Sequence, residues 1–422
     1  MISKKTLGNG SIFLFANILN ASIPFLLLPI LTRVLTPEDY GVVTMFAIFL
    51  PLINAFVGLS VHGAINVQYF KLDSERFSEY VTSCLILLVI SATIVFLIVF
   101  LAGGFFEDLI GIPHRWMLIA VVVSFFQFFV SIRLVIWVVT GRAINYGTFQ
   151  ISQTTINAGL SLLFVVYIGL KWEGRLLGQS IAVITFGLLA LFLIYRAGYI
   201  KMPHSASVDI RDALNFGIPL IPHTIGAFVI YSTDRVVISN LLDVTSVGIY
   251  MVGLQLGQAM GLVSDSFNKV YSPWLMRNLS DHNINKEKIV KNTYLAMLTL
   301  LLSGLIWYFF ASFLLTYIVG KEFQESASIL LYTCLGFSLT GLYYLVTNYI
   351  FYTKNTKYLA AITFFCGALN IPLTYWLVSL NGLIGAAIAF FIIQILFFIL
   401  TWLLAARVFP MPWFFFLKLN TN

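Results

Sequence analysis

The sequence predicts an all-α integral membrane protein with about twelve transmembrane helices. Of its 422 residues, 60% are hydrophobic and only 10% are charged. Apolar stretches of roughly 20 or more residues recur along the chain, and each can cross a hydrocarbon core about 30 Å thick. Because a backbone in lipid must satisfy its own hydrogen bonds, each stretch is expected to be helical. The expected spans are 8–35, 40–70, 80–103, 116–141, 147–170, 174–196, 212–242, 245–273, 289–319, 325–352, 357–380 and 382–406.

The first span and the basic residues set the expected orientation. Lys4 and Lys5 precede an apolar run that is too long for a signal peptide and has no small-residue cleavage site, so we expect a retained helix. With this end in the cytoplasm, most of the 24 lysines and arginines lie on the inner side, which predicts two cytoplasmic termini. This topology explains the net charge of +7 without a nucleic-acid partner. The outer connections hold Arg33, Arg115, Lys171, Arg175 and Lys321.

An internal repeat predicts two related halves. Residues 176–182 match 383–389, and Gly41 and Gly248 recur at the same offset after the first span of each half. Six spans per half make the repeat parallel, with an axis along the membrane normal. The expected domains are an N-terminal six-helix bundle 1–196, a cytoplasmic linker 197–211 and a C-terminal six-helix bundle 212–422, arranged around a central cavity.

Polar side chains recur at helical spacing in the first, second, seventh and eighth spans. They are costly in lipid, so we expect them to face protein or a water-filled cavity. The repeat pairs the first span with the seventh and the second with the eighth, which suits a central cleft. Hydrogen bonding between helices is the alternative interpretation, and His62 and His223 can equally be satisfied core histidines.

Ionisable residues inside the spans indicate which ligands such a cavity could bind. Arg133 has no acidic neighbour in its own span, and a guanidinium in a dry cleft suits a phosphate or carboxylate. Asp234 or Asp265 could exchange a proton or hold Na⁺. Structural roles remain open: Arg235 can neutralise Asp234, Asp265 and Lys269 are spaced for an ion pair, and Arg33 can anchor the helix at the interface.

The run Leu7-Gly8-Asn9, followed by PFLLLPILTRVLTPEDYG at 24–41, resembles the N-terminal signature of the Wzx-type flippases. These form the polysaccharide-export branch of the MOP superfamily, which also holds the MATE drug exporters. Residues 215–222, 232–235 and 247–250 extend the resemblance over essentially the whole chain. It implies a MOP/MATE-like fold of two six-helix bundles, with a cavity lined mainly by the first, second, seventh and eighth spans.

The resemblance also implies a function in the bacterial inner membrane. This is flipping of an undecaprenyl-diphosphate-linked oligosaccharide, such as an O-antigen unit, to the periplasmic leaflet by alternating access, coupled to H⁺ or Na⁺. The expected partners are this lipid-linked oligosaccharide, membrane lipids, and a glycan polymerase with its chain-length regulator. The candidate substrate-binding residues are Arg133, Arg235, Lys269, Arg33, His62, His223, Asn20 and Asn54, and the ion-coupling candidates are Asp234 and Asp265.

Two other functions stay open. The first is a MATE-like drug or cation antiporter, which the N-terminal signature disfavours. The second is a membrane glycan polymerase or ligase, which the short outer loops disfavour because such enzymes need a large one. The sequence has no Walker A phosphate loop, nucleophile elbow or His–Cys cluster, so we expect neither an enzyme nor a cofactor or metal.

Overall fold

The structure is a computed structural model that describes residues 19–20, 22–23, 25–280, 285–353 and 356–414. In this part of the chain all regular elements are helices. Nine are long and apolar enough to cross a membrane, or ten if the bent pair between Ala206 and Leu241 is one span. The predicted all-α membrane fold is therefore confirmed.

With the bent pair counted as one span, the difference between ten and the twelve predicted spans has two origins. Helix α13 (Thr356–Val408) joins two predicted spans, and Gly382, whose backbone is not helical, divides it at the predicted boundary. The first predicted span is described only in part, as the short apolar helix Phe25–Val34. Each half of α13 remains long enough to cross the membrane, because about 26 helical residues extend roughly 39 Å.

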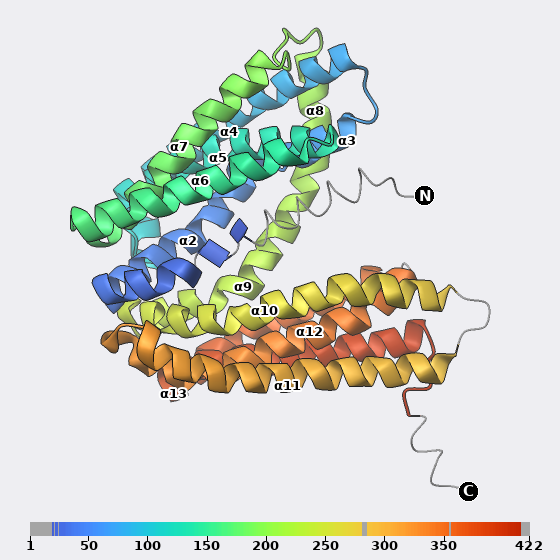
Figure 1. Ribbon diagram of the computed structural model, residues 1–422. Helices are drawn as coiled ribbons and strands as arrows, with labels where there is room; N and C mark the ends of the chain where they lie inside the picture. The colour runs from blue at the N-terminus through green and yellow to red at the C-terminus, as the bar shows by residue number, and fades with distance from the viewer. Residues whose placement is uncertain (1–18, 21, 24, 281–284, 354–355, 415–422) are drawn as a thin grey trace, which may run out of the picture. The chain divides into compact units, whose positions relative to one another are not determined.

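Contacts between residues divide the chain into unit 1 (Met1–Phe228) and unit 2 (Val229–Asn422). The boundary lies within α9, and the predicted division at 196 and 212 stays a prediction. In unit 1, α5 and α7 lie side by side, as do α6 and α7 (Figure 1). Unit 1 contains α2 (Pro37–Gly58), α3 (Val61–Gln68), α4 (Ser74–Ile110), α5 (His114–Val139), α6 (Ala143–Leu162), the π-helix η1 (Leu163–Tyr167), α7 (Lys171–Arg196), α8 (Ala206–Gly217) and the 3₁₀ turn η2 (Ile218–Leu220).

Helix α8 is fixed to α4 by two carboxylates, the buried Asp209 and the exposed Asp212. One Arg76 guanidinium contacts Glu79 (Nη1–Oε2, 2.5 Å) and Asp209 (Nη2–Oδ1, 2.7 Å). The Tyr80 hydroxyl donates to Asp212 at 2.8 Å. Because Glu79 and Asp209 are buried, the shared guanidinium compensates charge that water reaches poorly. The segment just before α9 is therefore part of unit 1.

The predicted span 40–70 is broken between α2 and α3. Leu59 and Ser60 adopt left-handed backbone conformations, with φ of 43° and 52°. Such conformations are costly for residues with a Cβ atom and need support from packing. Here α8 supplies it: a Cβ added to Gly217 would lie 2.8 Å from the Leu59 carbonyl carbon and still closer to its oxygen. Only glycine permits this approach of the two backbones.

Unit 2 contains most of α9 (Ile221–Leu241), then α10 (Val244–Leu279), α11 (Lys286–Ile318), the 3₁₀ segment η3 (Lys321–Ile329), α12 (Leu330–Tyr352) and α13. Helix α12 packs against α10, α11 and α13 (Figure 1). On the opposite side, α11 exposes Ile306, Phe309 and Phe313, which are 60–69% accessible. Their spacing places them on one helix face, and a continuous apolar face of this kind is suited to contact with lipid.

Glycine also brings helices into backbone contact within each unit. A Cβ on Gly178 of α7 would lie 2.5 Å from the Ser161 nitrogen of α6. Near the break in α13, a Cβ on Gly385 would lie 2.9 Å from the Val378 nitrogen. Real Cβ atoms essentially never come within 3.0 Å of such neighbours. Gly178 and Gly385 are matched positions of the sequence repeat.

Candidate functional site

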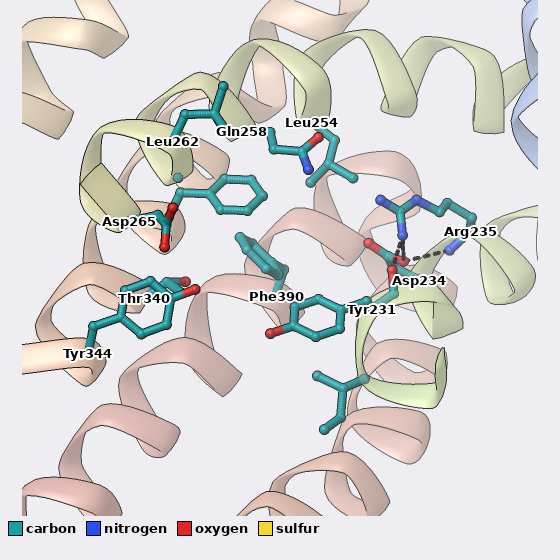
Figure 2. Close-up of a pocket in the computed structure, with 13 residues that line it drawn as sticks. Tyr231, Asp234, Arg235, Leu254, Gln258, Leu262, Asp265, Thr340, Tyr344 and Phe390 are labelled. Atoms are coloured by element: carbon teal, nitrogen blue, oxygen red, sulfur yellow. Dashed lines mark hydrogen bonds and ion pairs between the residues drawn. The ribbon is translucent and has the colours of Figure 1, made fainter. Parts of the chain in front are cut away.

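Unit 2 holds a cavity of about 390 Å³, formed by α9, α10, α12 and α13 (Figure 2). Its volume lies within the range of roughly 300–1,000 Å³ that is typical of small-molecule sites. The wall combines charged, amide, hydroxyl and aromatic side chains. The lining residues are Ile230, Tyr231, Asp234, Arg235, Leu254, Gln258, Gly261, Leu262, Asp265, Phe337, Thr340, Tyr344 and Phe390.

Asp234 and Arg235 lie together at one end of the cavity and form an ion pair, although the buried Nε of Arg235 has no hydrogen-bond partner among the described residues. The Asp234 carboxylate accepts hydrogen bonds from the Tyr250 hydroxyl (2.7 Å) and from the backbone N–H of Arg235 (2.9 Å). The Arg235 guanidinium lies 3.4 Å from the same carboxylate and donates to the Tyr231 carbonyl oxygen. The charge of Arg235 is thus offset within α9, where helix geometry places its partners.

Asp265 reaches the cavity from α10, seen opposite the Asp234–Arg235 pair in Figure 2. Its carboxylate lies 2.6 Å from the ammonium of Lys269, one turn further along the same helix. Both side chains are about half exposed, so this ion pair is partly solvated. Lys269 itself does not line the cavity.

Arg133 has a different environment in α5 of unit 1. Its residue is 5% exposed, and its guanidinium lies 4.4 Å from the centre of the Trp137 ring, a cation–π geometry. The Arg133 Nε atom is buried without a hydrogen-bond partner. Among the residues that the structure describes, no carboxylate forms an ion pair with Arg133.

The remaining candidates of unit 1 are also polar groups inside helices. Asn54 in α2 and His62 in α3 each bury one side-chain atom, Oδ1 and Nδ1, without a hydrogen-bond partner. Asn20 accepts a hydrogen bond from the Thr154 hydroxyl of α6. This is a hydrogen bond between helices, the alternative to a role in lining a cavity. Arg33 is exposed at the end of the helix Phe25–Val34. His223 lies in α9, but its side chain is outside the described part of the structure.

The structure therefore gathers Asp234, Arg235 and Asp265 around one cavity, with Lys269 beside it. The neutral part of this cavity was not predicted, because α12 and the second half of α13 carry no charged residue at these positions and an aromatic residue such as Tyr231 of α9 does not stand out in an apolar span. A tyrosine in the middle of an apolar span was the available signal, since its hydroxyl needs a partner. The residues missed are Tyr231, Phe337, Thr340, Tyr344 and Phe390.

Arg175, predicted to lie at the outer side, belongs to the beginning of α7. Its guanidinium donates to Asn157 Oδ1 and Ser161 Oγ, both at 3.0 Å. These partners are neutral, and they come from the α6 segment that packs against Gly178. Arg175 thus ties α6 to α7 through hydrogen bonds rather than anchoring a loop.

Sequence comparisons connect the chain with polysaccharide biosynthesis. A family model described as "Polysaccharide biosynthesis protein" matches residues 6–279. An "Uncharacterized membrane protein" of Haemophilus influenzae is 28% identical over 389 residues, which cover 89% of this chain and 90% of the relative. The "Capsular polysaccharide biosynthesis protein CapF" of Staphylococcus aureus is 24% identical over 405 residues, 92% of this chain and 96% of the relative.

Solved structures share the fold at low sequence identity. The "Lipid II flippase MurJ, inward closed conformation" has a TM-score of 0.75 and 17% identity, with 98% of this chain and 90% of that chain covered. An inward-facing multidrug resistance MATE family transporter of the MOP superfamily has a TM-score of 0.67 and 15% identity, with 95% and 96% covered. The predicted two-lobed MOP/MATE-like helical fold is therefore confirmed.

Proposed function

Because this chain belongs to the polysaccharide biosynthesis protein family, we propose that it is a flippase for a lipid-linked oligosaccharide. The proposed substrate is an undecaprenyl-diphosphate-linked repeat unit, for an O-antigen or a related glycan. The protein moves it from the cytoplasmic to the periplasmic leaflet of the bacterial inner membrane, with both of its own termini in the cytoplasm. The proposal includes alternating access, and a glycan polymerase with its chain-length regulator as the proteins that receive the product.

The main support for this proposal is the buried guanidinium of Arg133, which forms no ion pair with a carboxylate of the described residues. A buried guanidinium without a carboxylate partner costs several kcal/mol in a low-dielectric environment. A protein retains such a group where an anionic ligand compensates it, and planar paired donors fit a diphosphate. Arg235 and Lys269 are weaker candidates for this role, because carboxylates already neutralise them. Arg33, Asn20, Asn54, His62 and His223 remain candidate contacts along the substrate path.

Asp234 and Asp265 are the proposed ion-coupling residues. Both carboxylates line the cavity of unit 2 and both contact a basic side chain. Protonation or Na⁺ binding at either would weaken its ion pair. Transport coupled to H⁺ or Na⁺ then requires that the two states of the protein bind the cation with different affinity.

The test uses cells that lack this protein and any second flippase. Cells are rescued with the wild type, Arg133→Leu or Arg133→Lys, and surface glycan and lipid-linked intermediates are measured. We expect the knockout to lose surface glycan and to accumulate undecaprenyl-linked units on the cytoplasmic leaflet. Arg133→Leu should fail to rescue, since it keeps bulk beside Trp137 but removes the charge. Arg133→Lys should rescue in part.

Arg196→Ala is the matched control, since Arg196 is exposed at the end of α7 in the same unit. It should rescue fully at equal expression. Unchanged surface glycan in the knockout, without accumulated intermediates, would refute the flippase proposal. Loss of resistance to lipophilic cations in the same knockout would instead identify a MATE-like antiporter.

A further inference from the structure

We propose that the cavity of unit 2 is a sugar subsite, which binds the uncharged ring portion of the substrate and not its diphosphate. This inference rests on the proposed function, because it names where the glycan part of the proposed substrate binds within unit 2, in the cavity between α9, α10, α12 and α13.

Every charge in the cavity wall has a partner close by. Asp234 contacts Arg235 and Tyr250, and Asp265 contacts Lys269. Two carboxylates and two cations leave no net charge there. A diphosphate would have to compete with Asp234 for Arg235, and it would face both carboxylates. Like-charge repulsion in a cavity with limited water is unfavourable, so an anion is a poor occupant.

The groups left over are neutral hydrogen-bonding groups, aromatic faces and one buried donor of the paired Arg235, its Nε, which has no hydrogen-bond partner among the described residues. Within the described part of the chain, no hydrogen-bond partner contacts the Gln258 amide or the hydroxyls of Tyr231 and Tyr344. Figure 2 shows both tyrosine hydroxyls directed toward the middle of the cavity. Phe337 and Phe390, with ring centres 5.2 Å apart, complete the wall. The free groups include both donors and acceptors.

A pyranose ring matches this set of groups. Its hydroxyls both donate and accept, so they can pair with an amide and two phenols, and its C–H faces can pack on aromatic rings. The cavity volume of about 390 Å³ accommodates one or two sugar rings. A lipophilic cation would also contact the aromatic rings, but it would leave the amide and phenol groups without partners. Unpaired polar groups lower affinity, so the cavity favours the sugar.

The experiment measures binding to the full chain in lipid nanodiscs by saturation-transfer NMR. The probes are methyl α-D-glucopyranoside and N-acetylglucosamine, with inorganic pyrophosphate and tetraphenylphosphonium as competitors. We expect saturation transfer to a sugar that neither competitor removes. Gln258→Leu and Tyr344→Phe should each weaken binding about fivefold, the effect of one lost hydrogen bond. The double variant should weaken it roughly twentyfold if the effects add.

Tyr375→Phe is the matched control, because Tyr375 is 56% exposed on α13 and does not line the cavity. It should bind sugar like the wild type, and all variants should retain the wild-type melting temperature. Three results would overturn the inference: no saturation transfer to either sugar, transfer that persists in the double variant, or displacement of sugar by pyrophosphate or tetraphenylphosphonium. Any of these alongside intact glycan flipping in cells would reject the subsite alone. Unchanged surface glycan in the knockout, with intact sugar binding by the protein, would count against the proposed function instead.

Discussion

Substitution of Gly217 tests the contact that breaks the second predicted span. In an ordinary helix, Gly→Ala stabilises by about 1 kcal/mol. In α8 the new methyl group would lie 2.8 Å from the Leu59 carbonyl carbon and closer still to the oxygen. Backbone cannot rotate aside as a side chain can, and α8 is fixed to α4 through Asp209 and Asp212. Overpacking of this kind costs about 1–3 kcal/mol or more.

Clash and helix propensity therefore oppose each other, and the clash should prevail. We expect Gly217→Ala to lower the free energy of unfolding by about 2 kcal/mol. For a unit of this size this corresponds to a melting temperature lower by roughly 4–8 °C. Thermal unfolding of the full chain in one detergent, at a fixed scan rate, measures the difference.

Two further glycines of unit 1 have more space around the Cβ position, so Gly→Ala should cost less stability there. A Cβ on Gly63 would meet only the far end of the Phe216 ring, at 2.9 Å, so Gly63→Ala should cost less. Gly159 in α6 has open space around its Cβ position, and Gly159→Ala should leave the melting temperature unchanged or raise it. Equal melting temperatures for Gly217→Ala and Gly159→Ala would contradict the expected clash, because the approach of the two backbones would then impose no constraint.

Two other predictions concern buried partners. Arg76→Leu removes the guanidinium shared by two buried carboxylates. Hydrogen exchange over residues 206–217 should therefore accelerate, while exchange in α12 stays unchanged. Equal protection of residues 206–217 in the wild type and the variant would contradict the role of this contact. Tyr250→Phe removes the 2.7 Å hydrogen bond to the Asp234 carboxylate and should destabilise unit 2 by about 1.5–3 kcal/mol in denaturant unfolding, an effect that Tyr375→Phe should not have.

Hydrophobic length identified most membrane helices, because lipid imposes one simple requirement on every span. The boundary at Gly382 was predicted within the longest helix, α13, where the apolar run alone gives no break. The break at Leu59 was missed for the opposite reason. Leu59 and Ser60 have no local preference for left-handed conformations, and α8, far away in the sequence, stabilises them.

The sequence singled out those residues of the candidate site whose types are rare in membrane helices. Charged residues stand out in an apolar span, and Asp234, Arg235 and Asp265 line one cavity of unit 2, while their predicted roles and the predicted central cavity stay predictions. Aromatic residues make up 16% of the chain, so sequence alone cannot single out Tyr344 or Phe390. Their role depends on which face of α12 or α13 meets the cavity, and packing between helices decides that.

The glycine contacts at Gly178 and Gly385 limit how these helices can slide. Where two backbones touch, a shift along the helix axis would drive a neighbouring side chain into the opposing backbone. We therefore expect the α6–α7 pair, and the two parts of α13 beside Gly382, each to move as one rigid body in any conformational change.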